Sequence, residues 1–155
     1  MKAEIHPNDK IRLECFVRAE SSSTLSIPFF SAHVAAGFGN PADSHIEKWC
    51  DLNELCIDNK DATYFVYVES DSMIDAHITP GTWLIVDRSK KPRKGAVIVA
   101  WVNGAFTVKR VNKIGDLVVL MPANDDYTPI YVHEHDDFKL FGLVTFFFQK
   151  PAIIP

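Results

Sequence analysis

The sequence is poor in cysteine, in excess positive charge and in long apolar runs, and each shortage argues against a class of protein. Its three cysteines, Cys15, Cys50 and Cys56, are odd in number and show no CxxC spacing, which fits reduced thiols rather than a disulfide framework. The formal net charge is −4, so a general nucleic-acid or anionic-membrane surface is not indicated. The longest strongly apolar run, residues 140–148, is too short to span a bilayer, and Met1 does not open a secretory signal pattern. We therefore expect a cytoplasmic protein.

Leucine is also scarce relative to the β-branched residues. The chain has 155 residues, with 9 Leu against 13 Ile and 14 Val, and its 11 Phe add to the apolar total. That total is ample for a buried core, which excludes disorder throughout. A helix bundle would favour Leu, whereas Ile and Val fit the half-buried, pleated surface of a strand. Length and composition together predict one mainly β domain with at most a small appendage.

From residue 63 onward, short β-rich runs recur at intervals of about ten residues, separated by turn residues. Asn103-Gly104 lies between two of them and is the strongest hairpin signal, because a type I′ turn needs positive φ at both central positions. We expect a compact domain of several short, largely antiparallel strands. The predicted strands are 63–69, 82–87, 96–103, 105–111, 116–121, 128–132 and 138–148.

The first 60 residues have a different pattern. A strand is possible over 11–17, followed by a polar connection at 21–24. Asn40-Pro41 could cap a short helix whose apolar edge includes Ile46 and Trp49 and continues irregularly through Leu52 and Leu55. Residues 1–36 hold four basic and four acidic residues, so the whole net charge of −4 belongs to residues 37–155. We interpret 1–36 as an arm that is too short for a helix-turn-helix domain with its own core.

Two segments could carry chemistry, although each has an ordinary interpretation when taken alone. Ser72 follows the predicted strand 63–69 and could be a simple turn serine among aspartates. Lys109 lies in the return strand of the Asn103-Gly104 hairpin, 37 residues later, and could belong to a solvated strand face. Spacing alone does not decide between these interpretations and a catalytic pair.

The combination of the two segments resembles the Ser–Lys self-cleaving peptidases of the LexA and UmuD type. The resemblance covers residues 25–150, and the joint order and spacing of its motifs make it specific. The motifs are Ile27-Pro28-Phe29-Phe30-Ser31, Ala62-Thr63-Tyr64-Phe65-Val66, Asp71-Ser72-Met73-Ile74-Asp75, Leu84-Ile85-Val86-Asp87, Gly104-Ala105-Phe106-Thr107-Val108-Lys109 and Phe141-Gly142-Leu143-Val144.

The resemblance implies a site and a substrate within one chain. Ser72 would be the nucleophile and Lys109 its base, with Asp71 and Met73 beside the active site. Members of this family cut their own N-terminal arm at a bond between a small residue and glycine. Ala36-Gly37 is the only Ala-Gly pair, and Gly37 lies 35 residues before Ser72. The arm 1–36 would thus be removed from a dimerising domain of residues 37–155, although a flexible hinge is the alternative interpretation of this glycine.

The chemistry agrees with this assignment. A serine hydroxyl is a poor nucleophile until a neighbouring base takes its proton. Lysine can be that base only when neutral, and burial in an apolar setting lowers the lysine pKa. Lys109 lies in the β-rich run that also contains Val108 and Val111, where such burial is expected. A Ser–Lys pair needs neither histidine nor a bound metal, so we expect no cofactor.

The sequence departs from its relatives at two places. Relatives usually carry glycine where this chain has Ser70, and a side chain there would strain the loop before Ser72 if the position needs positive φ. The segment before Ile27 is also longer than in the UmuD proteins.

Other sites have weaker support. His133-x-His135 with Asp136-Asp137 could be a metal site, but alternating residues near a strand end are more often solvated. His77 could form a triad with Asp75 or Asp87, yet Lys109 accounts for more of the pattern.

The resemblance implies that RecA nucleoprotein filaments stimulate cleavage in the SOS response to DNA damage. The shortened homodimer would then join a UmuC-type Y-family polymerase for translesion synthesis. We expect no sequence-specific DNA binding and no membrane partner. The apolar stretch at Phe146-Phe147-Phe148 with Ile153-Ile154 favours pairing between chains. Alternatives are a LexA- or phage-type repressor, which needs a helix-turn-helix, a signal peptidase, which needs a membrane anchor, and a catalytically inactive binding module.

Overall fold

The computed structural model describes residues 2–12, 16–18, 26–30 and 46–152. Strands dominate these residues, which confirms the predicted mainly β class. The strands are β1 (Phe16–Arg18), β2 (Ser26–Phe30), β3 (Ile46–Asp51), β4 (Thr63–Tyr67), β5 (Trp83–Asp87), β6 (Val97–Val102), β7 (Ala105–Ile114), β8 (Leu117–Met121), β9 (Ile130–Val132) and β10 (Phe138–Phe148). The helical elements are the 3-10 turns η1 (Pro7–Asp9), η4 (Lys60–Ala62) and η5 (Ile74–Ala76), and the α-helix α1 (Leu52–Cys56).

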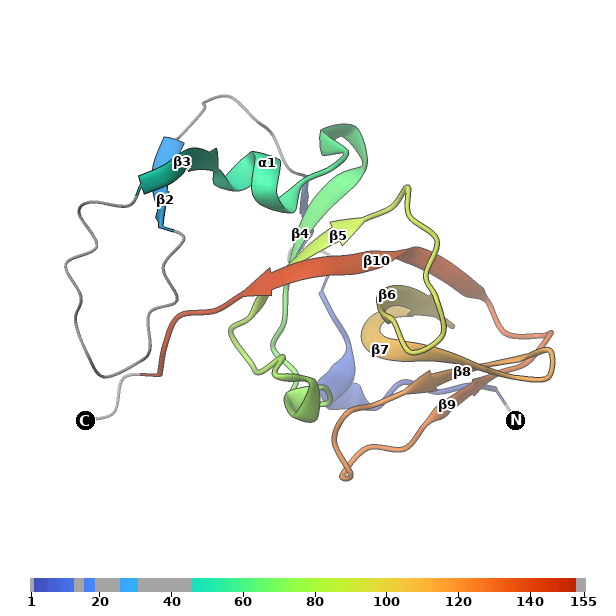
Figure 1. Ribbon diagram of the computed structural model, residues 1–155. Coiled ribbons are helices and arrows are strands. Elements are labelled where there is room, and N and C mark those ends of the chain that lie inside the picture. The colour runs from blue at the N-terminus through green and yellow to red at the C-terminus, as the bar shows by residue number, and fades with distance from the viewer. Residues whose placement is uncertain (1, 13–15, 19–25, 31–45, 153–155) are drawn as a thin grey trace.

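Eight strands form one curved antiparallel sheet in the order β1-β4-β5-β10-β6-β7-β8-β9. The long strand β10 joins its two halves, because residues 138–143 pair with β6 and residues 143–148 pair with β5. Figure 1 shows β10 crossing the molecule between the two groups of strands. The pair β2–β3 forms a separate two-stranded sheet on the side of the molecule away from the β8–β9 hairpin (Figure 1).

The β6–β7 hairpin follows the sequence prediction. Asn103 has φ 45° and Gly104 has φ 101°, the positive angles that this tight turn requires. The turn sets a continuous register that places Lys109 opposite Ile98 in the interior of the pair. The predicted strands from residue 63 onward are likewise present, with boundaries shifted by a few residues.

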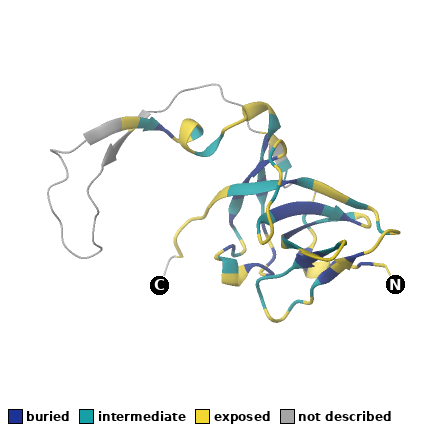
Figure 2. Ribbon diagram, turned by 45° about the vertical axis from the view of Figure 1, so that its right-hand side comes forward, coloured by how far each residue is buried: buried dark blue, intermediate teal, exposed yellow. Residues whose placement is uncertain are grey.

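Apolar side chains fill the two faces of the sheet as two clusters. Because side chains alternate along a strand, β6 contributes to both clusters, with Ile98 and Ala100 in one and Val99 in the other. Figure 2 shows the buried residues concentrated in the strands at the centre of the β-domain. The first cluster also contains Val102, Leu120, Ile130 and Val132, and the second contains Val66, Val68, Met73, Ile78, Leu84, Val86 and Val108.

The helix predicted around Ile46 and Trp49 was wrong. Residues Ile46–Asp51 form strand β3, which pairs with β2. Among the described residues, α-helix occurs only in the short segment Leu52–Cys56, where the Asp51 side chain accepts a hydrogen bond from the Asn53 amide at 2.8 Å and caps the turn. The strand partner of Trp49 is Pro28, so pairing with a remote segment overrides the local apolar spacing.

The predicted strand over residues 11–17 is only partly present. Phe16–Arg18 pairs with β4, and Ile11 forms an isolated bridge with Phe106. The cap predicted at Asn40-Pro41 lies outside the described residues, as do Ala36 and Gly37.

The N-terminal residues pack into the β-domain instead of standing apart from it. Ala3 and Ile5 are buried in the first apolar cluster. The Ala3 amide donates to Asp136 Oδ1 at 2.9 Å, and Asn103 Nδ2 donates to the Ala3 carbonyl at 2.8 Å. Residues 2–12 therefore belong structurally to the β-domain. In the described part of the chain, every helix is too short or too polar to cross a bilayer.

Candidate active site

Ser72 lies in the loop between β4 and η5, and neighbouring contacts hold that loop rigid. Met73 is buried in the second apolar cluster, and its carbonyl accepts hydrogen bonds from the Ala76 and Ile78 amides. The Ser72 carbonyl accepts from the Ala123 amide at 2.9 Å. These contacts fix the backbone of Ser72 and Met73. A fixed backbone is a condition for a well-oriented nucleophile.

Asp71 helps to hold the same loop through contacts with Tyr127 and Asn124. The Tyr127 hydroxyl donates to Asp71 Oδ1 at 2.5 Å, and Asn124 Nδ2 donates to the Asp71 carbonyl at 3.1 Å. The hydrogen bond to Asp71 raises the pKa of Tyr127, because the neutral phenol is the donor. The structure thus places both Asp71 and Met73 beside the site as supports of the loop.

Strand β7 carries Lys109, and the Lys109 side chain contacts the loop that contains Ser72. Thr107 and Lys109 lie two residues apart and therefore share one face of the strand. The Lys109 side chain is only 1% exposed, and its Nζ donates to Ser72 Oγ at 2.8 Å. It also donates to the Val108 carbonyl at 2.9 Å and to Thr107 Oγ1 at 3.2 Å. The structure therefore brings Ser72 and Lys109 into direct contact in a buried site.

Asp9 is a third member of the site, and sequence reasoning missed it. Its side chain is 2% exposed and forms an ion pair with Lys109. Ser72 Oγ donates to Asp9 Oδ1 at 2.6 Å. The residue sits in the short turn η1, 63 residues from Ser72 and 100 from Lys109. An aspartate in a Pro-Asn-Asp turn carries no local signal for such a role.

Burial and ion pairing act on Lys109 in opposite directions. Burial lowers its pKa, because the ammonium form loses its hydration, while the charge and hydrogen bond of Asp9 raise it. The net direction is downward. A lysine with a lowered pKa is neutral more often at neutral pH, which is the state that can accept a proton from serine.

Ser70 does not strain the loop. In the described part of the chain, the residues other than glycine with positive φ are His77 and Asn103, so Ser70 has an ordinary backbone. Its hydroxyl accepts a hydrogen bond from the Ser72 amide at 3.1 Å and donates to Asp9 Oδ1 at 2.9 Å. The condition for strain, a positive φ at position 70, is therefore not met, because this loop reaches Ser72 without a left-handed residue there.

The weaker sequence candidates do not join the site. His77 is exposed, and the Ser72 hydroxyl contacts Lys109 and Asp9 instead. Asp136 accepts hydrogen bonds from the His133 amide, the Asn103 side chain and the Ala3 amide, and these contacts hold the pKa of its carboxyl well below the usual range. In the described residues no three His, Cys, Asp or Glu side chains gather as a metal site.

Comparison with known proteins gives consistent matches over most of the chain. Residues 28–145 match the model of a family described as peptidase S24-like. Protein MucA of Salmonella typhimurium is 34% identical over 136 residues, which cover 87% of this chain and 92% of MucA. Protein SamA of Salmonella typhimurium strain LT2 is 37% identical over 123 residues, covering 79% of this chain and 85% of SamA. LexA repressor 1 of Xanthomonas oryzae pv. oryzae is 34% identical over 140 residues, covering 90% of this chain and 69% of the repressor.

Proposed function

Because the chain belongs to the peptidase S24-like family, we propose that it cleaves its own backbone between Ala36 and Gly37. Ser72 acts as the nucleophile and Lys109 as the general base. The observation that carries the proposal is the contact of 2.8 Å between Ser72 Oγ and Lys109 Nζ in a buried site. Burial supplies the lowered lysine pKa that this chemistry requires.

The reaction follows from the two side chains. Neutral Lys109 takes the hydroxyl proton of Ser72 as Oγ attacks the carbonyl carbon of Ala36. The bond from that carbon to the Gly37 nitrogen then breaks, and Lys109 returns the proton to the leaving amine. A water molecule, deprotonated by Lys109, hydrolyses the ester between Ser72 and Ala36. The products are an arm ending in a carboxylate and a domain beginning at Gly37. Each chain contains one such bond, so the cleavage occurs once per chain.

The proposed biological role follows from the sequence resemblance. RecA nucleoprotein filaments would stimulate this cleavage during the SOS response. The shortened domain, residues 37–155, would act as a homodimer with a UmuC-type Y-family polymerase in translesion synthesis. A repressor remains the second candidate, since the chain is 34% identical to LexA repressor 1 over 140 residues.

The first test is the intact mass of the purified full chain during incubation. We expect slow conversion to a product that begins at Gly37, and complete loss of conversion in Ser72→Ala and Lys109→Ala. Gly37→Glu should also block conversion while leaving the fold intact, because a large charged side chain hinders entry of the bond into the site. Adding RecA, nucleotide and single-stranded DNA should accelerate conversion of the wild-type chain.

Two controls make this test specific. Lys113→Ala removes an exposed lysine from the same strand and should leave the rate unchanged. His77→Ala should also leave it unchanged, whereas a loss of cleavage in that variant would favour a histidine base. Conversion that persists in Ser72→Ala would refute the mechanism. No acceleration by RecA filaments would argue against the SOS role alone.

A further inference from the structure

The N-terminal segment, defined as residues 2–12, places a carboxylate inside the proposed catalytic site. We infer that this segment is an intramolecular inhibitor, in which Asp9 occupies the Ser72–Lys109 centre and must leave before the scissile bond can enter. The inference rests on the proposed function, whose regulation it describes.

Four side chains from two elements converge on Asp9 and form a built carboxylate site. Oδ1 accepts hydrogen bonds from Ser72 Oγ at 2.6 Å and from Ser70 Oγ at 2.9 Å. Oδ2 accepts from Thr107 Oγ1 at 3.1 Å and pairs with the Lys109 ammonium. Both carboxylate oxygens are thus fully engaged, and the side chain is only 2% exposed.

This arrangement opposes catalysis in two ways. The Ser72 hydroxyl directs its proton to Asp9, so the carboxylate lies against the nucleophile where the substrate carbonyl has to approach. The ion pair with Asp9 also favours the ammonium form of Lys109, whereas proton transfer from serine needs the neutral amine. The bound carboxylate therefore stabilises an inactive state of both side chains.

Ser70 extends the effect to the backbone of the nucleophile. Its hydroxyl accepts the hydrogen bond of the Ser72 amide while donating to Asp9. An amide at the nucleophile is a natural donor to the oxyanion that forms during acyl transfer. Ser70 therefore links the carboxylate to a donor that catalysis needs.

Contacts on both sides of Asp9 hold the segment in place. Ala3 and Ile5 are buried in the apolar core on one side. On the other side the Ile11 amide donates to the Phe106 carbonyl at 2.9 Å, and Arg12 pairs with Glu69. Residues 2–12 contribute no strand to the eight-stranded sheet, so the segment can detach without breaking the pairing of its strands.

The segment also lies in the right part of the chain for such a role. It precedes residues 28–145, which match the family model, so it lies outside the matched region. It also precedes Ala36 and Gly37, so the proposed cleavage separates it from the domain that it inhibits.

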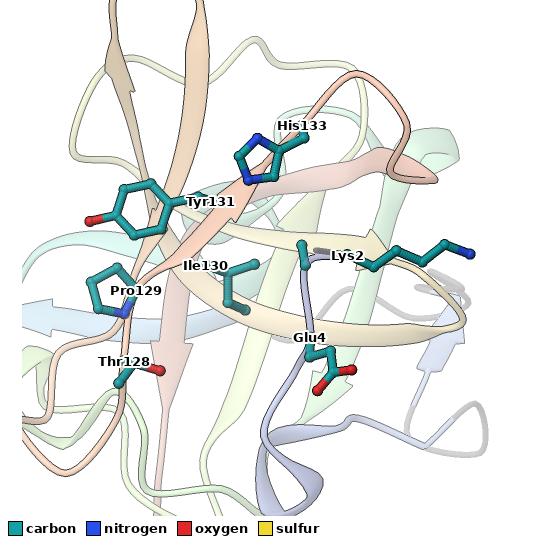
Figure 3. Close-up of a pocket in the computed structure, with 8 residues that line it drawn as sticks. Lys2, Glu4, Thr128, Pro129, Ile130, Tyr131 and His133 are labelled. Carbon is teal, nitrogen blue, oxygen red and sulfur yellow. The ribbon is translucent and has the colours of Figure 1, made fainter.

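The test compares the full-length chain with Asp9→Asn and Asp9→Gly. Glu4→Gln is the matched control, because it removes a carboxylate from the same segment. Glu4 is exposed and lines a pocket of about 280 Å³ between the segment and β9, separate from the Asp9 contacts (Figure 3). Two rates are measured by intact mass: self-cleavage, and labelling of Ser72 by a fluorophosphonate. We expect both rates to rise in the Asp9 variants, because Ser72 is no longer covered and the neutral amine of Lys109 becomes more populated, and to stay unchanged in Glu4→Gln.

Added acetate gives a second measurement of the same site. Asp9→Gly leaves a space bordered by the four donors, and acetate should occupy it and slow labelling again in a concentration-dependent way. Acetamide, which has a similar shape and no charge, should not slow labelling. Wild-type protein should not respond to either molecule, since Asp9 already fills the site.

The outcomes separate this inference from the proposed function. Faster labelling of Ser72 without any self-cleavage supports the inhibitor and refutes the self-cleavage. Unchanged rates in both Asp9 variants overturn the inhibitor. Slower rates also overturn it, because they would make Asp9 a positioning residue for Lys109. If the Asp9 variants do not fold, Ile5→Ala weakens the docking of the segment without touching the four donors. Its rates should rise too, and unchanged rates there would refute the inference.

Discussion

Lys109 is an ionisable residue in the interior, and its surroundings explain how its burial is tolerated and how the proposed mechanism uses it. Burying an ammonium group is unfavourable unless it is paired or neutral. Here Asp9 pairs with it, and oxygen atoms of Ser72, Thr107 and Val108 accept its hydrogen bonds. Removing the Asp9 carboxylate would leave burial as the main influence on the Lys109 pKa. The neutral amine would then become more favourable.

The pH dependence of self-cleavage tests this balance. Burial lowers the pKa of Lys109, and in the proposed mechanism the neutral amine is the active base. The rate should therefore rise with pH and level off below the ordinary lysine pKa of about 10.4. Asp9 is the titratable group that contacts Lys109, and it raises the Lys109 pKa. The midpoint of the profile should therefore move to lower pH in Asp9→Asn.

The measurement is the initial rate of mass conversion between about pH 6 and 10, with circular dichroism as the check on folding. A rate that falls from neutral to alkaline pH in folded protein would contradict lysine as the base. An identical midpoint in Asp9→Asn would contradict the coupling between the two residues.

At the scale of elements, β10 decides the shape of the sheet, because it changes partner along its length. Leu143 pairs with Ile98 of β6 and with Asp87 of β5. Register shifts on either side, between Leu140 and Gly142 and between Val144 and Phe146, bend the strand at this crossing. This bend brings the β4–β5 part of the sheet, which leads to Ser72, toward the β6–β7 hairpin that carries Lys109.

Gly142 is needed where the strands cross. A Cβ atom there would lie 2.7 Å from Val86 Cγ1 and 3.0 Å from the Asp87 carbonyl oxygen. Val86 is fully buried and Asp87 contributes backbone, so neither can move freely. Gly142→Ala should lower the free energy of unfolding by about 1–3 kcal/mol through overpacking, measured by urea denaturation.

The matched control on the same strand is Leu140→Ala. Leu140 is 40% exposed, so its truncation should cost less than about 1 kcal/mol. If Gly142→Ala is as stable as the wild type, the close approach of β10 to β5 is not a packing constraint.

At the scale of the whole molecule, the C-terminal half of β10 presents an apolar surface. Phe146, Phe147 and Phe148 are all exposed. In the described part of the chain, this stretch pairs with β5 on one edge, while β6 reaches only residue 143 on the other. An open strand edge with exposed aromatic residues favours association with another chain. This feature supports the proposed homodimer.

Phe147→Lys tests that association. A charged side chain in an apolar interface is unfavourable, so we expect the variant to be mainly monomeric at concentrations where the wild type is dimeric. Sedimentation velocity measures the change. Ile114→Lys is the control, because Ile114 is 61% exposed and lies at the tip of the β7–β8 hairpin, outside the β10 edge. If both variants remain dimeric, the interface lies elsewhere.

The amino-acid sequence by itself determined the features that depend on local chemistry and on motif order. The excess of Ile and Val indicated the mainly β class, and Asn103-Gly104 indicated the hairpin that carries Lys109. The ordered motifs around Ser72 and Lys109 indicated the LexA and UmuD type of family, and the family match confirms that resemblance. Each of these signals lies within a few residues of the feature that it predicts, or within a pattern of relatives.

The tertiary structure alone decided the features that depend on remote partners. Pairing with β2 made residues 46–51 a strand, although their local spacing favoured a helix. Asp9 lies in the proposed active site although 63 residues separate it from Ser72 and 100 from Lys109. A carboxylate becomes a ligand for these donors only when folding brings them together and excludes water. The residues next to Asp9 in the sequence indicate neither condition. For this reason the arm that the sequence predicts as a substrate also contains the carboxylate that contacts Ser72 and Lys109 at the proposed catalytic centre.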